Sequence, residues 1–260
     1  MGDFGSVGAW WLLVVVVVGA ILVSVGSVWL VGRFVSRDTG PEHNSILSPF
    51  LTVVGLIFGA LLGFTVVVGW QQFLSAEVNV ANEAAVLTTL YRQTVAMPQD
   101  EQTQLRQQLR DYARALQGPE WGKDDFGKIG HEGRSALLEM YRIAGRPQPS
   151  GATVPVNQQF LSELTNLAAD RSTRILDSKP RIPPLLWCSL ICGSAVLIVL
   201  TSSMRLRDNR AHVVLVGVVT VLLGLLLYLV FTLDHPFGPM GVTAQPFAHA
   251  VTVFDSIDRS

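Results

Sequence analysis

The residue types that could do chemistry are few in this chain, and most of them stand apart from one another. The sequence contains no HExxH, GxSxG, P-loop or CxxC motif, which are patterns of zinc hydrolases, serine hydrolases, phosphate-binding loops and thiol oxidoreductases. The histidines have no mutual spacing that suits metal ligation. They are His43, His131, His212, His235 and His249. We therefore expect no enzyme activity, and no metal or cofactor.

The chemistry that the sequence does offer is neutral hydrogen bonding at the end of a long apolar run. The amides of Gln71, Gln72 and Asn79 follow the stretch FTVVV at 64–68 without an intervening proline. A hydrophobic constriction that opens to water has this pattern, and so does any membrane helix that enters solvent. We take the first interpretation as our hypothesis. The predicted constriction and mouth are Phe64, Thr65, Val67, Val68, Gln71, Gln72 and Asn79.

Glycines precede this stretch at regular spacing. Gly55, Gly59 and Gly63 are four residues apart, so they lie along one side of a helix. In lipid, helices associate by close packing, and small residues at this spacing let two backbones approach. The glycines predict a helix-packing surface, either against another helix of the same chain or between subunits around an axis.

The elements that hold these residues are membrane helices. Hydrophobic residues make up 49% of the 260 residues and charged residues only 15%, and the mean hydropathy is +0.40. Four runs are long enough to cross about 30 Å of hydrocarbon. The predicted transmembrane helices are 8–32, 47–74, 183–203 and 212–233. None of them carries an ionisable residue away from its ends, which argues against proton-coupled transport and voltage sensing.

A helical region separates the second and third spans. Residues 75–182 predict a soluble domain, and 234–260 form a C-terminal tail. A helix unbroken from 47 to 96 would be about 75 Å long, and Met97-Pro98 would end it. No strand-like alternation occurs in the sequence, so we predict an all-α integral membrane protein. The formal net charge of −1 gives no indication of nucleic acid as a partner.

Several segments in this order resemble the bacterial bestrophin-like domain family. They are EHNS at 42–45, GFTVVVGWQQF at 63–73, NEAAVLTTLYR at 82–92, LRDYARAL at 109–116, IPPLLW at 182–187 and DHPFGPMGV at 234–242. The resemblance implies a relation to bestrophins, which are pentameric anion channels whose second helix lines the pore. The acidic calcium clasp of bestrophins has no clear copy here. Asp124-Asp125 is the nearest candidate and lacks the alternating oxygen-ligand pattern of a calcium loop.

The segment DHPF belongs to the matched pattern, and we predict a structural clamp at Asp234 and His235. Two arguments about the orientation in the membrane give opposite results. Arginines at 33 and 37 and at 205, 207 and 210 lie in the short connections, so the positive-inside rule places the N-terminus and the soluble domain outside a bacterial inner membrane. The analogy with bestrophins implies the reverse orientation.

Two functions fit these observations. The first is a homo-oligomeric channel that conducts small inorganic ions across the bilayer through a pore lined by the second span; the resemblance implies a pentamer. The alternative is a membrane-anchored sensor or scaffold that conducts nothing and binds a partner through its soluble helices. In a channel Gln71, Gln72 and Asn79 should face a common axis, and in a scaffold they should face neighbouring helices or lipid headgroups.

Overall fold

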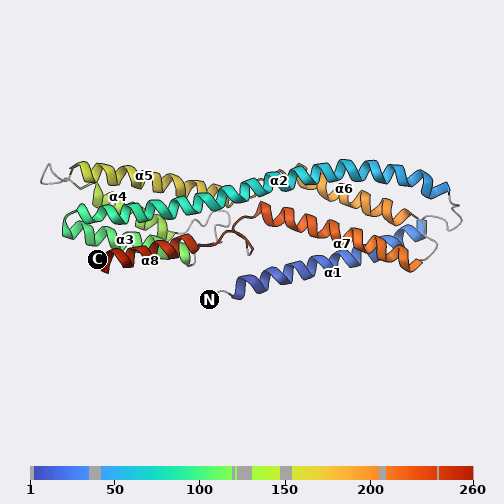
Figure 1. Ribbon diagram of the computed structural model, residues 1–260, viewed down its shortest axis with the longest axis horizontal. Coiled ribbons are helices and arrows are strands. Elements are labelled where there is room, and N and C mark those ends of the chain that lie inside the picture. Colours follow the sequence, from blue (N-terminus) through green and yellow to red (C-terminus); the bar gives the residue numbers. More distant parts are fainter. Residues whose placement is uncertain are drawn as a thin grey trace. The chain divides into compact units, whose positions relative to one another are not determined.

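The computed structural model of the chain describes residues 3–34, 42–118, 121, 131–146, 154–204, 209–238 and 240–259. Every regular element within these ranges is a helix (Figure 1). The chain divides into two compact units. Unit 1 comprises Met1–Gln72 and Arg181–Asp234, and unit 2 comprises Phe73–Pro180 and His235–Ser260. The predicted all-α class is confirmed for the described residues.

Unit 1 contains the membrane helices. It consists of α1 (Asp3–Phe34), α6 (Pro184–Ser203), α7 (Asn209–Asp234) and the first part of α2 (Glu42–Gln93). By length and apolar composition α1, α2, α6 and α7 could each cross a membrane. Helices suit that surrounding because each satisfies its own backbone hydrogen bonds. Helix α1 packs along α7 and α6, and α6 packs on α7.

Small residues and hydroxyl groups let the helices of unit 1 approach closely. A methyl group added at Gly224 of α7 would lie 3.3 Å from the Ala20 Cβ of α1. The hydroxyls of Ser27 and Ser202 share a hydrogen bond of 2.9 Å, which joins α1 to α6. An apolar core fills the rest of the unit, and its buried members are Phe58, Leu62, Leu190, Leu197, Leu223 and Val230.

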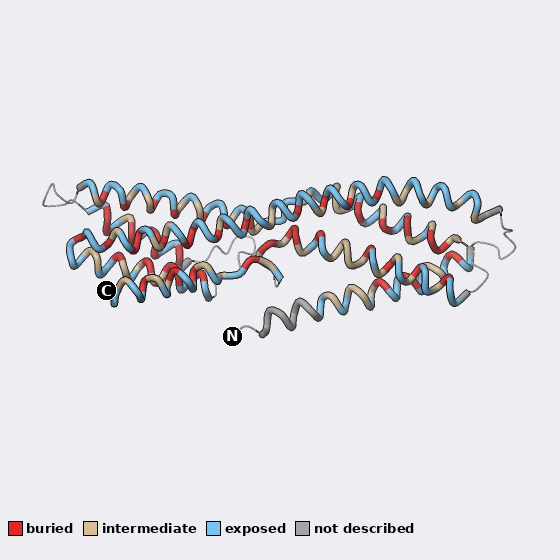
Figure 2. The backbone as a smooth tube through the Cα atoms, viewed as in Figure 1, coloured by how far each residue is buried: buried red, intermediate tan, exposed pale blue. Residues whose placement is uncertain are grey.

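Unit 2 is built from shorter, amphipathic helices around the second part of α2. Helix α2 ends at Gln93 and continues as a 3-10 turn (Thr94–Ala96), after which Pro98 precedes α3 (Gln99–Gln117). The other helices are α4 (His131–Ala144), α5 (Val154–Asp177) and α8 (Gln245–Arg259). Each turns one side inward, because apolar residues recur every three or four positions (Figure 2).

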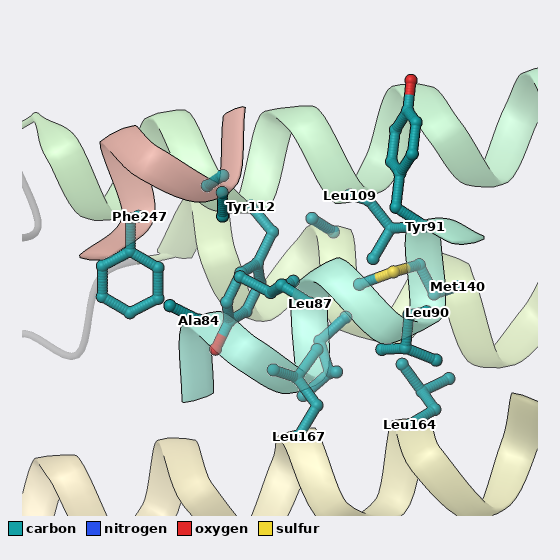
Figure 3. Packing of buried hydrophobic residues seen from close by; sticks show 14 of the residues in the cluster. Ala84, Leu87, Leu90, Tyr91, Leu109, Tyr112, Met140, Leu164, Leu167 and Phe247 are labelled. Carbon is teal, nitrogen blue, oxygen red and sulfur yellow. The ribbon is translucent and has the colours of Figure 1, made fainter. Parts of the chain in front are cut away.

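The core of unit 2 collects side chains from α2, α3, α4, α5 and α8 (Figure 3). Tyr112 reaches from α3 toward α2, and Leu164 and Leu167 approach from α5. Helix α8 contributes Phe247 and Phe254, which are fully buried. The sequence analysis predicted only a tail at 234–260 and no helix within it. Phe247, Ala250 and Phe254 nevertheless have the spacing of an amphipathic helix.

Candidate functional site

In unit 1, one side of α2 is exposed along the stretch that carries the predicted site. Phe64 is 74% exposed and Val67 is 54% exposed. A methyl group added at Gly59 or Gly63 would meet no atom of the described residues within 4 Å, and one at Gly55 would meet only Leu197 Cδ2, at 3.9 Å. The predicted packing surface at Gly59 and Gly63 is therefore open in the single chain. The exposed face of unit 1 consists of Ala60, Phe64, Val67 and Gln71, with Gly59, Gly63 and Val68 beside it.

The opposite side of α2 is packed within unit 1, and glycine serves that packing at other positions. A methyl group added at Gly193 of α6 would lie 2.5 Å from the Phe58 ring of α2. One at Gly69 would lie 3.2 Å from the Leu233 Cβ of α7. The glycines that bring helices of the chain together here are thus Gly193 and Gly69, which were not among the predicted packing glycines.

Two of the predicted lining residues are hydrogen-bonded to their own chain. Thr65 is buried, and its hydroxyl donates to the Leu61 carbonyl oxygen at 2.8 Å. Asn79, in unit 2, donates from Nδ2 to Asp177 Oδ2 of α5 at 2.7 Å. Thr65 is about 100° around the helix from the exposed Phe64, and Asn79 is directed toward α5 by its hydrogen bond. Thr65 and Asn79 thus have hydrogen-bond partners within their own chain, and their place in the lining stays a prediction.

The three amides do not share one side of the helix. Gln71 is exposed, Gln72 is half-buried, and Asn79 is hydrogen-bonded to α5. The neutral polar groups thus differ in exposure: Gln71 is exposed, whereas Gln72 and Asn79 are both half-buried. Only Gln71 lies on the same side as Phe64 and Val67.

In unit 2, α2 again exposes one side. Val78 is 57% exposed. One set of its exposed residues recurs at intervals of three and four, which places that set along a single stripe on the helix. The exposed face of unit 2 consists of Leu74, Val78, Ala81, Ala85, Thr89 and Arg92.

The predicted clamp residue Asp234 lies at the end of α7 and is almost fully buried. Its Oδ1 accepts the backbone N–H groups of Arg181 and Ile182, both at 2.9 Å, and its Oδ2 accepts Trp187 Nε1–H at 3.1 Å. This carboxylate therefore holds the entry of α6 against the end of α7. The dipole of α6 favours a carboxylate near its first turn, whereas the dipole of α7 opposes one at its last residue.

His235 begins the turn that leads toward α8. Its carbonyl oxygen accepts the Gly238 N–H at 2.9 Å, and the Pro236 carbonyl oxygen accepts the Val242 N–H at 2.7 Å. A Cβ atom at Gly241 would collide with the Pro236 carbonyl oxygen, so this tight turn requires glycine.

A buried ionic group occupies the core of unit 2, and it was not predicted from the sequence. The Glu83 side chain of α2 is fully buried, its Oε1 accepts the Tyr112 hydroxyl at 2.5 Å, and its Oε2 accepts Arg174 Nε–H at 2.8 Å. Burial raises the pKa of Glu83, while the charge of Arg174 opposes that rise. The available signal was weak: Glu83 falls at helical spacing between the buried Val80 and Leu87.

A second ionic group attaches α8 to α3. Arg106 donates to Asp258 at 2.6 Å, and Arg110 donates to both Asp255 and Asp258 at 2.7 Å. The Tyr91 hydroxyl also donates to Asp258, at 2.7 Å. Partial burial acts to raise the pKa of Asp258, but the hydrogen bonds from Tyr91 and Arg110 and the charges of the two arginines hold that pKa below its ordinary value.

Metal ligands do not gather in the part of the chain that the structure describes: no group of three His, Cys, Asp or Glu side chains could hold an ion there. The calcium candidate Asp124-Asp125 lies outside the described residues.

Comparisons with known proteins give the family and the fold. The Bestrophin-like domain family matches residues 18–247. The crystal structure of a bacterial bestrophin homologue from Klebsiella pneumoniae, solved by Zn-SAD phasing, superposes with a TM-score of 0.64 at 14% identity, over 94% of this chain and 96% of that one. A crystal structure described as a membrane protein with a single-residue change gives a TM-score of 0.68 at 14% identity, over 94% and 97%.

A point mutant of the Klebsiella pneumoniae homologue gives a TM-score of 0.61 at 15% identity, over 94% of this chain and 96% of that one. No curated protein matches the chain. At these identities the structural likeness establishes the fold, and the sequence match over most of the chain establishes the family. The chain is a member of the bestrophin-like family of membrane proteins.

Proposed function

We propose that the chain assembles with copies of itself in a bacterial inner membrane and conducts small inorganic ions along a path lined by exposed residues of α2. The observation that carries the proposal is the exposed side of α2. Large apolar side chains such as Phe64 and Val67 are exposed in the single chain. The buried residues of α2 in unit 1, such as Phe58, lie on the other side of the helix.

The spacing of the exposed residues supports several copies of α2 around one axis. Intervals of three and four keep these residues on one side of a helix with 3.6 residues per turn, so the same side of each copy could face a common axis. The open glycines at Gly59 and Gly63 would let a helix of a second copy approach closely. A ring of Phe64 and Val67 would form the apolar constriction, and a ring of Gln71 would supply hydrogen bonds where ions regain water.

Unit 2 would lie in the aqueous phase, because its helices are amphipathic and it contains charged groups on α3 and α8. The arginines of the short connections would place it outside the inner membrane. Labelling of an exposed position such as Gln107→Cys with a thiol reagent that cannot cross the membrane, in intact and in permeabilised cells, would test that orientation.

The experiment that tests conduction is ion flux through purified protein in liposomes. Gly59→Leu should abolish flux because it fills the open surface between copies, and Val67→Ser should raise flux because it makes the constriction more polar. Val66→Ser is the matched control, since Val66 is half-buried in the core of unit 1 and lies beside Val67 in the chain.

Two results would overturn the proposal. One is a single-chain mass for the wild type in native-like detergent. The other is wild-type flux no higher than that of empty liposomes under varied pH, calcium and voltage. Either result would favour the sensor or scaffold.

A further inference from the structure

The buried ionic group of unit 2 fixes α2 in a way that apolar packing does not. Both carboxylate oxygens of Glu83 are occupied, one by Tyr112 of α3 and the other by Arg174 of α5. Arg171, also on α5 and buried, is close enough for its charge to act on Glu83. Figure 3 shows the Tyr112 side chain reaching from α3 into the region around α2. One residue of α2 is therefore held from two other helices.

A second anchor stands one turn earlier on the same side of α2. Asn79 precedes Glu83 by four residues and donates to Asp177, which is itself buried on α5. The antiparallel order of the two pairs, Asn79 with Asp177 and Glu83 with Arg174, ties α2 to α5 at two successive turns. Rotation of α2 about its axis would break both pairs at once.

The anchored side lies opposite the exposed face of unit 2. At about 100° per residue, Val78 and Ala81 are roughly 140° and 200° around the helix from Glu83. Contacts between leucine, valine and alanine side chains have little directional preference. Hydrogen bonds to a carboxylate form only at particular distances and angles between donor and acceptor. Glu83 is thus well placed to decide which residues of α2 are exposed.

We infer that Glu83 is a positioning residue: with Arg174 and Tyr112 it sets the rotation of α2 and thereby presents Val78, Ala81 and Ala85 on the exposed side. As far as it concerns ion conduction, this inference rests on the proposed function. It assigns Glu83 no contact with the ions. A buried ion pair often contributes little net stability compared with apolar residues of the same size, so specification of one geometry is a physical reason for its presence.

The test is a cysteine scan of α2 in the full-length protein with Cys188→Ser and Cys192→Ser as background. Reporter cysteines at Val78 and Ala81 should react quickly with a water-soluble thiol reagent. Reporters at the buried Ala76 and Val80 should react slowly. The exposed and the buried reporter cysteines together show how α2 is rotated about its axis.

Adding Glu83→Gln should lower the reactivity at Val78 and Ala81 several-fold and raise it at Ala76 and Val80. The amide keeps an acceptor for Tyr112 but can present an N–H group to Arg174, so the second bond is lost. A merely structural role would loosen the core and raise the buried reporters without lowering the exposed ones. Glu139→Gln on α4 is the matched control, because Glu139 pairs with Arg142 at the surface of one helix.

If Glu83→Gln does not fold, the double variant Glu83→Gln with Arg174→Met replaces it, since removal of both charges leaves none unpaired between them. An exchange of reactivity between the two reporter pairs supports the inference. A wild-type reactivity profile in the folded single or double variant overturns it. Absence of wild-type ion flux would instead overturn the proposed function, and the reactivity profile would still decide the role of Glu83.

Discussion

The two parts of α2 bury their packed sides by different means. In unit 1 the packed side is apolar apart from Thr65, whose hydroxyl bonds within its own helix, and contact depends on shape: the Phe58 ring lies where a side chain at Gly193 would be. In unit 2 the packed side is also largely apolar, with Val80 and Leu87 fully buried, but Asn79 and Glu83 add paired charges and hydrogen bonds to it. The difference follows from the helices around each part.

Lipid-facing helices gain little from burying apolar surface, because lipid tails are as apolar as the side chains, so close contact between backbones must hold them together. In unit 2 the apolar residues of α3 and α5 already provide a core around Leu87 and Leu90. A paired carboxylate there adds direction to the packing. One helix is thus held by apolar packing in one part, and by apolar packing together with paired charges in the other.

The largest effect should follow from breaking the charge pair at one end only. Glu83→Ala leaves Arg174, which is 3% exposed, without its carboxylate, and should lower the free energy of unfolding of unit 2 by about 3–5 kcal/mol. Thermal unfolding in detergent, followed by circular dichroism, measures the loss. Removing both partners with Glu83→Gln and Arg174→Met should recover much of it, and an equal loss in the double variant would contradict the explanation.

A smaller loss of stability should follow from disturbing the close contact between α6 and the Phe58 ring in unit 1. Gly193→Ala places a methyl group 2.5 Å from the Phe58 ring, and such overpacking typically costs about 1–3 kcal/mol. Gly26→Ala on α1 is the matched control, since nothing described lies within 4 Å of the added atom. Phe58→Leu should partly rescue Gly193→Ala. Equal melting temperatures for the two alanine variants would show that shape does not hold α2 in unit 1.

The Asp234 clamp is a place in unit 1 where charge rather than shape acts. Asp234→Asn replaces one of two accepting oxygens by an N–H donor that faces the Trp187 N–H, and one unsatisfied buried group costs about 1–3 kcal/mol. The shift in melting temperature measures the cost. Trp187→Phe should produce a similar loss, and the double variant should lose less than the sum of the two. Additive losses would mean that the bond contributes little.

The smallest effect concerns the surface charges that attach α8. The folded-state pKa of Asp258 is lowered, so its contribution to stability is present above the ordinary pKa of about 4 and is lost as the pH falls through the lowered value. Because its side chain is partly exposed, the contribution should be no more than about 1 kcal/mol. Spin labels at Gln107→Cys and Ser256→Cys should show a broader distance distribution at pH 3 than at pH 7. With Asp258→Asn, the distribution should already be broader at pH 7; an unchanged one would mean that this carboxylate does not hold α8 on α3.

Much of the fold could be predicted from the sequence, because a helix that crosses the hydrocarbon of a bilayer needs only sufficient length and apolar side chains. The four apolar runs predict four membrane helices without knowledge of their neighbours, and Met97-Pro98 marks a helix end by local sterics. The rotation of α2 was not readable in the same way. FTVVV is apolar on every side, so nothing in its pattern distinguishes the buried Thr65 from the exposed Val67.

What the sequence determined by itself is therefore the all-helical class, the membrane runs, the family resemblance and the residue types available on α2. The tertiary structure decided which of those residues face outward, that Gly193 rather than Gly59 receives a neighbouring ring, and that Glu83 meets Arg174 from 91 positions away. Local sequence fixes a helix because its hydrogen bonds join near neighbours. Which side of that helix is covered depends on partners that are distant in the chain and adjacent only after folding.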